Sequence, residues 1–321
     1  MKIGWGLLPM ATVTCAFCVW ADEDRIRQAV QKAIPLIEKS AATYVQKRDC
    51  FTCHHQALPL MVFSRVKSAG FQVGDDSISK QVHFSLEYFN DRLHRLPKGQ
   101  GVPGGPYTAG YALTGLSEAK VTGDETTKAL VSYLLKIQNK DGSWRIRTHR
   151  PPLEDSHFTA TALALRGLVE FGDGEKIADS INSALAWLNK TQPRSGEDHA
   201  FKVLGLHWAG ADKSSAAEAL LQLQREDQGW AQLPGMKSDA YATGQVLATL
   251  RRSGFLKPSS PQYKAGIQWL LGHQQPDGSW HVKTRSKPIQ KYFESGFPHG
   301  KDQFISISAT CWAVMALLPP S

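Results

Sequence analysis

Apolar residues recur along this chain every three to four positions, which is the period of an α-helix that buries one face. The alternation of apolar and polar residues that marks a half-buried strand is almost absent after Ala21. Gly, Pro and Asp interrupt the helical stretches, for example over residues 97–106, 172–174 and 258–261. The pattern therefore predicts an all-α protein whose helices follow one another in pairs.

The paired segments are of two kinds. The outer member of each pair is expected at 24–47, 76–95, 124–138, 175–191, 212–224 and 260–274. The inner member is expected at 55–69, 107–119, 157–171, 199–209, 240–253 and 304–318. Inner segments share small residues at helical spacing, as in Phe158-Thr-Ala-Thr-Ala-Leu-Ala-Leu165, and small residues let helix backbones pack closely. Because an amphipathic hairpin buries its apolar face only against neighbours, the six pairs predict one domain, an (α/α)6 toroid (barrel) over residues 22–321.

One phrase occurs three times, each time with Gln six residues before Trp. The copies are Gln138-Asn-Lys-Asp-Gly-Ser-Trp144, Gln224-Arg-Glu-Asp-Gln-Gly-Trp230 and Gln274-Gln-Pro-Asp-Gly-Ser-Trp280. An aromatic-led helical segment precedes two of them, Tyr133-Leu-Leu-Lys-Ile and Trp269-Leu-Leu-Gly-His. A supersecondary unit repeated in this way indicates a ring or array of similar hairpins.

The first and third copies, with the helical residues before them, resemble the QW motif of squalene–hopene and oxidosqualene cyclases. Related repeats occur in protein prenyltransferase β subunits. The resemblance extends over about residues 120–318 and implies the α/α toroid. In these families the Gln ties a helix end and the Trp packs on it, so the resemblance implies structural roles for Gln138, Trp144, Gln274 and Trp280.

The catalytic features of these families are not retained. Squalene–hopene cyclases protonate an alkene with an Asp-x-Asp-Asp-Thr-Ala stretch, and the corresponding residues here are Asp155-Ser-His157-Phe158-Thr-Ala160. Protonating an unactivated alkene requires a strong carboxylic acid, and His and Phe replace the two later carboxyl groups. The prenyltransferase zinc site pairs an Asp with a Cys two residues later, but Asp239 is followed at that position by Tyr241. The resemblance therefore implies neither a functional squalene–hopene cyclase nor a protein prenyltransferase.

Polar residues nevertheless gather where the inner helices are expected to begin. The pairs Asp155/His157, Asp198/His199 and Asp239/Tyr241 fall at equivalent depths. Asp155 and Asp239 are open to two interpretations, as helix N-caps or as site residues. His157, His199 and Tyr241 either line a shared cavity or pack as ordinary polar residues. These five are the candidate catalytic residues: His157, Asp155, Asp239, Tyr241 and His199.

The string Cys50-Phe-Thr-Cys53-His54 (residues 50–54) matches the attachment signal for a c-type haem. In that interpretation Cys50 and Cys53 anchor haem c, and His54 ligates its iron. The motif stands in the turn of the first hairpin, where no separate cytochrome domain fits. The alternatives are a Cys50–Cys53 disulfide or redox dithiol, and a small metal clip completed by His54 or His55.

The amino-terminal 21 residues predict a signal peptide, because Lys2 precedes an apolar stretch that ends in Val19-Trp20-Ala21. We therefore expect an exported protein, periplasmic or secreted, without a transmembrane segment in the mature chain. The net charge of +8 is spread along the chain, and no nucleic-acid motif is present. The expected partner is a redox protein or an apolar small molecule.

Three functions follow from these features. The first is a haem-c-bearing toroid that transfers electrons or performs redox chemistry near its cavity. The second is a terpenoid-cyclase-like toroid that binds an isoprenoid or other apolar ligand without haem, its Cys pair being structural. The third is a non-catalytic scaffold, since a fold does not determine a function.

Overall fold

The computed structural model describes residues 16–319, with side chains from residue 23 onwards. Most of the predicted signal peptide, residues 1–21, lies outside the described residues, so it stays a prediction. The outer helices are α1 (Ala16–Lys47), α3 (Ser77–Asn90), α5 (Glu125–Ile137), α7 (Glu175–Lys190), α9 (Ser214–Leu221) and α11 (Pro261–His273). The inner helices are α2 (Leu58–Ser68), α4 (Pro106–Glu118), α6 (His157–Phe171), α8 (Gly196–Trp208), α10 (Ala240–Arg252) and α12 (Gln303–Leu317). Short turns of helix lie at Cys53–Ala57 (η1), Leu96–Lys98 (η2) and Gly300–Asp302 (η3).

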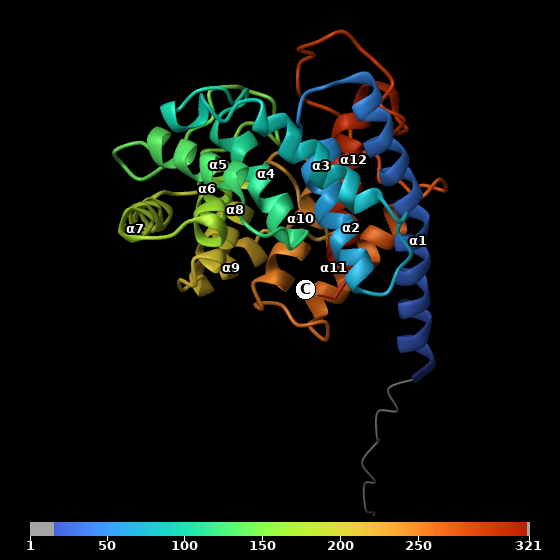
Figure 1. Cartoon of the computed structure of the whole chain (residues 1–321). Helices are drawn as coiled ribbons and strands as arrows, with labels where there is room; N and C mark the ends of the chain where they lie inside the picture. The colour runs from blue at the N-terminus through green and yellow to red at the C-terminus, as the bar shows by residue number, and fades with distance from the viewer. Residues whose placement is uncertain (1–15, 320–321) are drawn as a thin grey trace, which may run out of the picture.

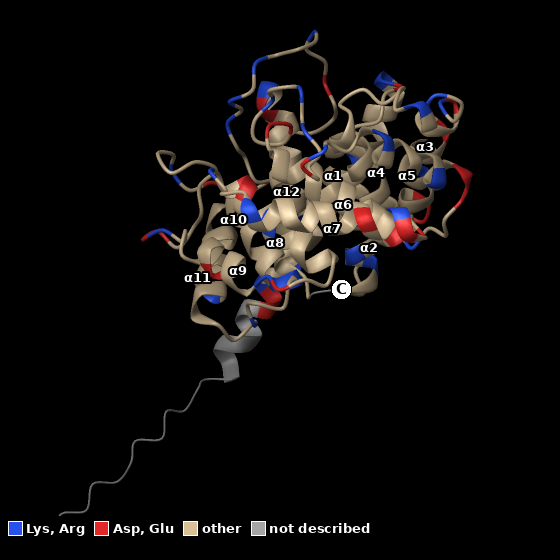
Figure 2. Ribbon diagram, turned by 90° about the vertical axis from the view of Figure 1, so that its left-hand side faces the viewer, with Lys and Arg blue, Asp and Glu red and all other residues tan. Residues whose placement is uncertain are grey.

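The six inner helices form a closed ring. Each packs against the next along the chain, and the last, α12, packs against the first, α2. Each outer helix covers inner helices from outside, and Figure 1 places α1 and α7 on opposite sides of the molecule. Figure 2 shows most charged residues on the outer helices and loops. No strand occurs between residues 16 and 319, which confirms the predicted single-domain (α/α)6 toroid.

Small residues allow the inner helices to approach closely, as expected. A Cβ atom at Gly110 of α4 would lie 2.6 Å from the Leu163 Cβ of α6. At Gly244 of α10 it would lie 2.6 Å from the backbone nitrogen of Ala313 on α12. Real Cβ atoms do not approach neighbours this closely, so these two helix contacts require glycine.

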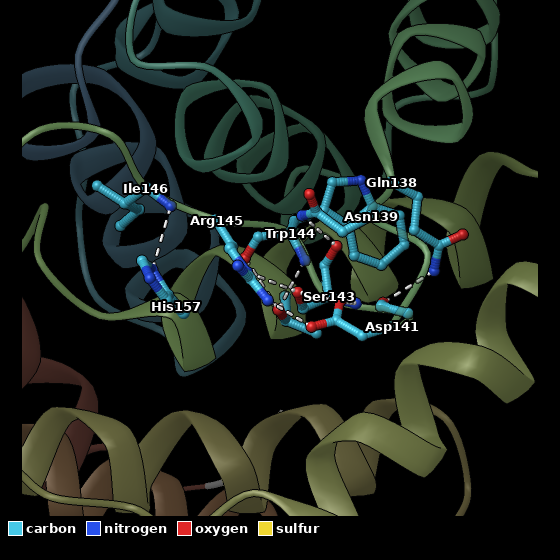
Figure 3. A network of polar contacts seen from close by, with 10 residues as sticks. Gln138, Asn139, Asp141, Ser143, Trp144, Arg145, Ile146 and His157 are labelled. Carbon is cyan, nitrogen blue, oxygen red and sulfur yellow. Dashed lines mark hydrogen bonds and ion pairs between the residues drawn. The ribbon is translucent and has the colours of Figure 1, made fainter.

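The repeated Gln-to-Trp turns join neighbouring hairpins. The indole Nε1–H of Trp280 donates to the Leu270 carbonyl at 2.8 Å, and its backbone N–H donates to Thr310 Oγ1 at 3.0 Å. Gln274 donates to the Gly278 carbonyl of its own turn and to the Ala29 carbonyl of α1, both at 2.9 Å. The last motif is therefore bonded to the first helix of the chain. Figure 3 shows the equivalent turn of Gln138 and Trp144, so the structural roles implied by the resemblance are confirmed.

Two predicted segments are longer than the helices observed. Residues 76–95 form α3 only as far as Asn90, after which the chain turns into η2. Residues 212–224 form α9 only over Ser214–Leu221, because Asp212 binds the backbone N–H of Ser214 and the repeat turn begins directly after the helix. None of the described helices is both long and apolar enough to span a bilayer.

Candidate functional site

The amino ends of the six inner helices meet at one end of the ring, which we call the mouth. Side chains at the starts of different inner helices, and of η1 in front of α2, contact one another there. The contacts are Tyr107 with Cys53, Phe304 with His54, Ser156 with Asp198, Thr159 with Glu197, and Tyr241 with Glu197. Polar side chains therefore do meet at the starts of the inner helices, as predicted. Some of the residues that meet there differ from those expected.

Glu197 is the acidic group at the centre of this gathering. It lies in the first turn of α8 and is 4% exposed. Its Oε1 accepts from Thr159 Oγ1 at 2.9 Å, and its Oε2 accepts from Tyr241 OH at 2.9 Å and Gln245 Nε2 at 2.8 Å. All three donors are uncharged. Burial raises the pKa of Glu197 to about 7, even though the three hydrogen bonds oppose the shift.

Two tyrosines lie near this carboxyl group, and further aromatic rings pack close to them along the inner helices. Burial raises the pKa of Tyr111, on α4, and the nearby charge of Glu197 raises it further. Tyr241 donates a hydrogen bond to Glu197 directly. Phe201 follows Glu197 by one turn of α8 and meets Trp312 of α12 with ring centroids 6.4 Å apart. Tyr111, Tyr241 and Phe201 are each fully buried. This part of the ring interior therefore combines a buried acid with buried aromatic side chains.

The sequence does contain a signal for Glu197, which the prediction missed. Glu197 precedes Phe201 by four positions and Leu204 by seven, so it lies on the apolar stripe of its helix. A carboxyl group on a buried stripe is uncommon and is costly unless it is hydrogen-bonded. The inner segment was expected to begin at 199, whereas α8 begins at Gly196. The predicted boundary therefore assigned Glu197 to the loop before the helix.

Of the candidate residues, Tyr241 and Asp239 lie at the start of α10 on the inner side of the mouth. Tyr241 is 1% exposed and belongs to the Glu197 cluster. Asp239 caps its helix, because its Oδ1 accepts from the Ala242 backbone N–H at 3.0 Å. Burial raises the pKa of Asp239 to about 6. The N-cap interpretation of Asp239 is thus confirmed.

Asp155 and His157 occupy the rim instead. Ser156, not Asp155, caps α6, so that N-cap interpretation was wrong by one residue. Asp155 contacts His149 Nδ1 at 2.5 Å, and His157 is exposed and accepts from the Ile146 backbone N–H (Figure 3). His157 and Tyr241 therefore do not share one buried lining.

His199 is half-buried on α8, next to Asp198. Burial lowers its pKa, while the neighbouring Asp198 raises it. Asp198 itself accepts from Ser156 Oγ at 2.6 Å and from the backbone N–H of Arg194 at 2.9 Å. These contacts join the starts of α6 and α8, and the structure gives Asp198 a helix-joining role.

The Cys-x-x-Cys-His string enters the mouth through η1, a π-helical turn in front of α2. Cys53 is buried and its sulfur accepts from Tyr107 OH at 3.0 Å, whereas the Cys50 sulfur lies 3.1 Å from Tyr44 OH. Burial raises the pKa of the Cys53 thiol to about 12. The two sulfurs thus contact tyrosines on two different helices, α4 and α1. A thiol with this pKa is a poor nucleophile and a poor metal ligand, because both roles require the thiolate.

His54 and His55 lie side by side, with their Nδ1 atoms in contact. His55 is fully buried, stacks on Tyr44 with centroids 4.6 Å apart, and has no partner for its Nε2 among the described residues. Burial lowers the pKa of His54 to about 3, and Arg150 adds to the shift. Both imidazoles are therefore neutral at physiological pH. Within residues 23–319 no three His, Cys, Asp or Glu side chains form a group able to hold a metal ion.

Comparison with known families and proteins supports the toroid. Residues 83–205 match the family model described as the prenyltransferase alpha-alpha toroid domain. A terpene cyclase–glycosyl transferase fusion protein of Humicola fuscoatra is 27% identical over 176 residues. That match covers 54% of this chain and 11% of the relative, so the chain spans only about a tenth of the fungal protein.

Solved structures extend the likeness to nearly the whole chain. Type II terpene cyclase MstE from Scytonema, in complex with its product merosterolic acid A, aligns with a TM-score of 0.59 at 15% identity, over 93% of this chain and 98% of that one. A glycosidase in complex with glucose aligns with a TM-score of 0.58 at 12% identity, over 93% and 99%. Because proteins of unrelated activity share the architecture at these identities, the likeness shows the fold alone.

Proposed function

We propose that the interior of the ring binds an apolar, isoprenoid-type molecule that carries one polar group, and that Glu197 is the residue which binds that group and exchanges a proton with it. The observation that carries the proposal is the buried carboxyl group of Glu197, hydrogen-bonded only by uncharged donors and close to the buried rings of Tyr241 and Tyr111. Apolar walls with a few convergent polar groups are typical of small-molecule sites. A solved structure of the terpene cyclase MstE from Scytonema holds its substrate geranylgeranyl dihydroxybenzoate, which contains an isoprenoid chain.

The pKa of Glu197 limits the chemistry. A carboxyl group with a pKa of about 7 is suited to general acid–base catalysis near neutral pH. It is a much weaker acid than protonation of an unactivated alkene requires. We therefore infer proton transfer with an oxygen-bearing group, such as an alcohol or an epoxide, and not cyclisation of squalene.

Access to the interior requires side chains to move, because the rings beside Glu197 are packed. Two loops cover the mouth, residues 145–156 and 281–302. Phe293 of the second loop contacts Tyr44 and Phe304, both with centroids 5.8 Å apart. We infer that the ligand enters where this loop lifts. Lifting would break the ring contacts of Phe293, the hydrogen bond from Gln303 to the Phe293 carbonyl and the hydrogen bond from Ser40 to the Ser295 carbonyl.

Equilibrium binding of geranylgeraniol, followed by quenching of intrinsic fluorescence, tests the proposal. Glu197→Gln should weaken binding by about tenfold, the value of a hydrogen bond to a charged or polarised carboxyl group. The control Glu226→Gln removes an exposed carboxyl group and should leave the affinity unchanged. Squalane, which has no polar group, should bind wild type and Glu197→Gln equally. Equal geranylgeraniol affinities for wild type and Glu197→Gln would remove Glu197 from the site.

A haem-c protein is the second candidate function, on the observation that His54 and His55 place neutral, metal-ligating imidazoles directly after the Cys pair. The residues do not fit the group in the conformation described, because Cys53 is buried against Tyr107 and Cys50 faces Tyr44. Attachment would require both tyrosine contacts to open. This candidate therefore depends on a change at η1 that the ligand-binding proposal does not need.

Expression in a periplasm with a haem-c maturation system should give a colourless protein whose intact mass includes no haem, because Cys53 is buried. A Soret band that survives denaturation, together with the added mass of one haem, would instead establish covalent attachment. In that case Cys50→Ser with Cys53→Ser should abolish the band. Cys311→Ser, which changes a buried thiol outside the motif, should retain it.

A further inference from the structure

The end of the ring opposite the mouth, where the inner helices finish, carries a cluster of arginines around one carboxylate. Glu118, at the end of α4, lies between Arg65 of α2 and Arg252 of α10. Arg65 Nε is 2.9 Å from Glu118 Oε2, and Arg252 Nη2 is 2.6 Å from Glu118 Oε1. The Arg65 and Glu118 side chains are less than a tenth exposed, and that of Arg252 is 14% exposed. Three inner helices are thus joined through buried charges.

Arg166 of α6 adds a third guanidinium group. Its Nη1 lies 2.8 Å from Glu170 Oε1, its Nη2 donates to Ser117 Oγ at 3.1 Å, and its guanidinium carbon lies 5.6 Å from the centre of the Trp208 ring. Burial lowers the pKa of Arg252 to about 10, and the nearby positive charges of Arg65 and Arg166 contribute to this shift. The three cations therefore repel one another, and two carboxylates do not neutralise them.

Several guanidinium donors at this end have no acceptor. Arg252 Nε, Arg252 Nη1 and Arg166 Nε are buried and make no hydrogen bond within the described residues. A buried donor without a partner destabilises a protein, and an arginine provides five N–H groups in a planar fork. The helix dipoles favour positive charge here, because the inner helices end at this side of the ring. This attraction does not supply hydrogen-bond acceptors for the three unpaired guanidinium donors.

A hollow beside the cluster leads to solvent. It has a volume of about 500 Å³ and is lined by residues of the α4–α5 and α6–α7 turns, including Ser117, Lys120 and Glu170. Ser117 and Glu170 are the two residues that bond Arg166. None of the three arginines lines the hollow, so a small ligand there would contact Lys120 directly and would be separated from Arg166 by Ser117 and Glu170.

We propose that the arginine cluster, Arg65, Arg166 and Arg252, is a binding site for a phosphate-type oxyanion. Its oxygens would accept single hydrogen bonds from the unpaired donors of Arg252 and Arg166, after the serine and glutamate side chains that separate Arg166 from the hollow move aside. Glu118 would hold Arg65 and Arg252 in place. The site lies at the opposite end of the ring from Glu197 and does not depend on the function proposed for that residue.

Calorimetric titration with inorganic phosphate and pyrophosphate, at constant ionic strength set with chloride, tests the site. Wild type should bind one anion per chain saturably. Arg252→Met should weaken the affinity by about tenfold or more, since it removes two charge-assisted donors. Arg145→Gln removes one positive charge at the mouth, where Arg145 pairs with Asp141, and should leave the affinity unchanged. Circular dichroism establishes that each variant is folded; if Arg252→Met is not, Arg166→Gln should show the same loss.

No saturable binding of either anion by wild type, or an equal loss in Arg145→Gln, would overturn the proposal. Sedimentation with vesicles of phosphatidylcholine, with and without phosphatidic acid, identifies the source of the phosphate. Binding only to vesicles with phosphatidic acid, lost in Arg252→Met, would indicate a lipid headgroup. Binding of pyrophosphate without vesicle binding would indicate a soluble phosphate compound.

Discussion

Replacing Trp280 by Ala should lower the free energy of unfolding by about 3–5 kcal/mol, the usual cost of removing a large buried aromatic side chain. Trp280 is fully buried, and its indole N–H bonds the end of α11 through the Leu270 carbonyl. Its turn also carries Gln274, which is bonded to α1. The substitution therefore removes core volume at the place where the last hairpin meets the first. Urea denaturation followed by circular dichroism measures the change.

Trp269→Ala provides the matched control. Trp269 lies on the same hairpin but is only partly buried, stacked on His273 with ring centroids 3.8 Å apart. Its removal should cost clearly less than that of Trp280. Equal losses for the two variants would mean that the repeat turn contributes nothing beyond ordinary packing.

The contribution of Glu197 to stability should fall as the pH rises from about 4.5 to 8. The pKa of Glu197 is about 7 in the folded protein against an ordinary value of 4.5, because burial disfavours its charged form. Below pH 4.5 the carboxyl group is protonated in both states and its contribution is fully present; that contribution is lost as the pH rises through 7. A shift of this size corresponds to about 3 kcal/mol.

The Glu197→Gln variant isolates this effect from other titrating groups, such as Asp239. The difference in unfolding free energy between wild type and Glu197→Gln should change by about 3 kcal/mol, in favour of the variant, between pH 4.5 and pH 8. Denaturation curves at four or five pH values suffice to measure it. Parallel pH profiles for the two proteins would show that Glu197 titrates normally.

The ring could be predicted from the sequence because its signals are local and repeated. The helical period marks each segment, the small residues distinguish inner from outer helices, and three Gln-to-Trp turns mark the joints. Helix ends are less well determined. Asp155 and Ser156 are both good N-cap residues, and only the backbone geometry shows that Ser156 binds the Thr159 N–H.

The candidate site was harder to predict because it depends on contacts between helices far apart in the chain. Thr159, Glu197 and Tyr241 come from three inner helices, and nothing in their local sequence says that they meet. Tyr241 was selected because the aligned starts of the inner segments place it at the same depth as His157 and His199, whereas Glu197 fell before the expected start of its segment. The arginine cluster escaped notice for the same reason, since Arg65, Glu118 and Arg252 are joined only by closure of the ring.

The carboxyl resonance of Glu197 gives the most direct test of the proposed function. Protein labelled with carbon-13 at the glutamate side-chain carboxyl, with the resonance assigned by its loss in Glu197→Gln, can be titrated with and without geranylgeraniol. The account predicts a titration near pH 7 in the free protein and a clear change in the apparent pKa when the ligand is bound. A Glu197 resonance that titrates near its ordinary value of 4.5, or one that the ligand leaves unchanged, would contradict it.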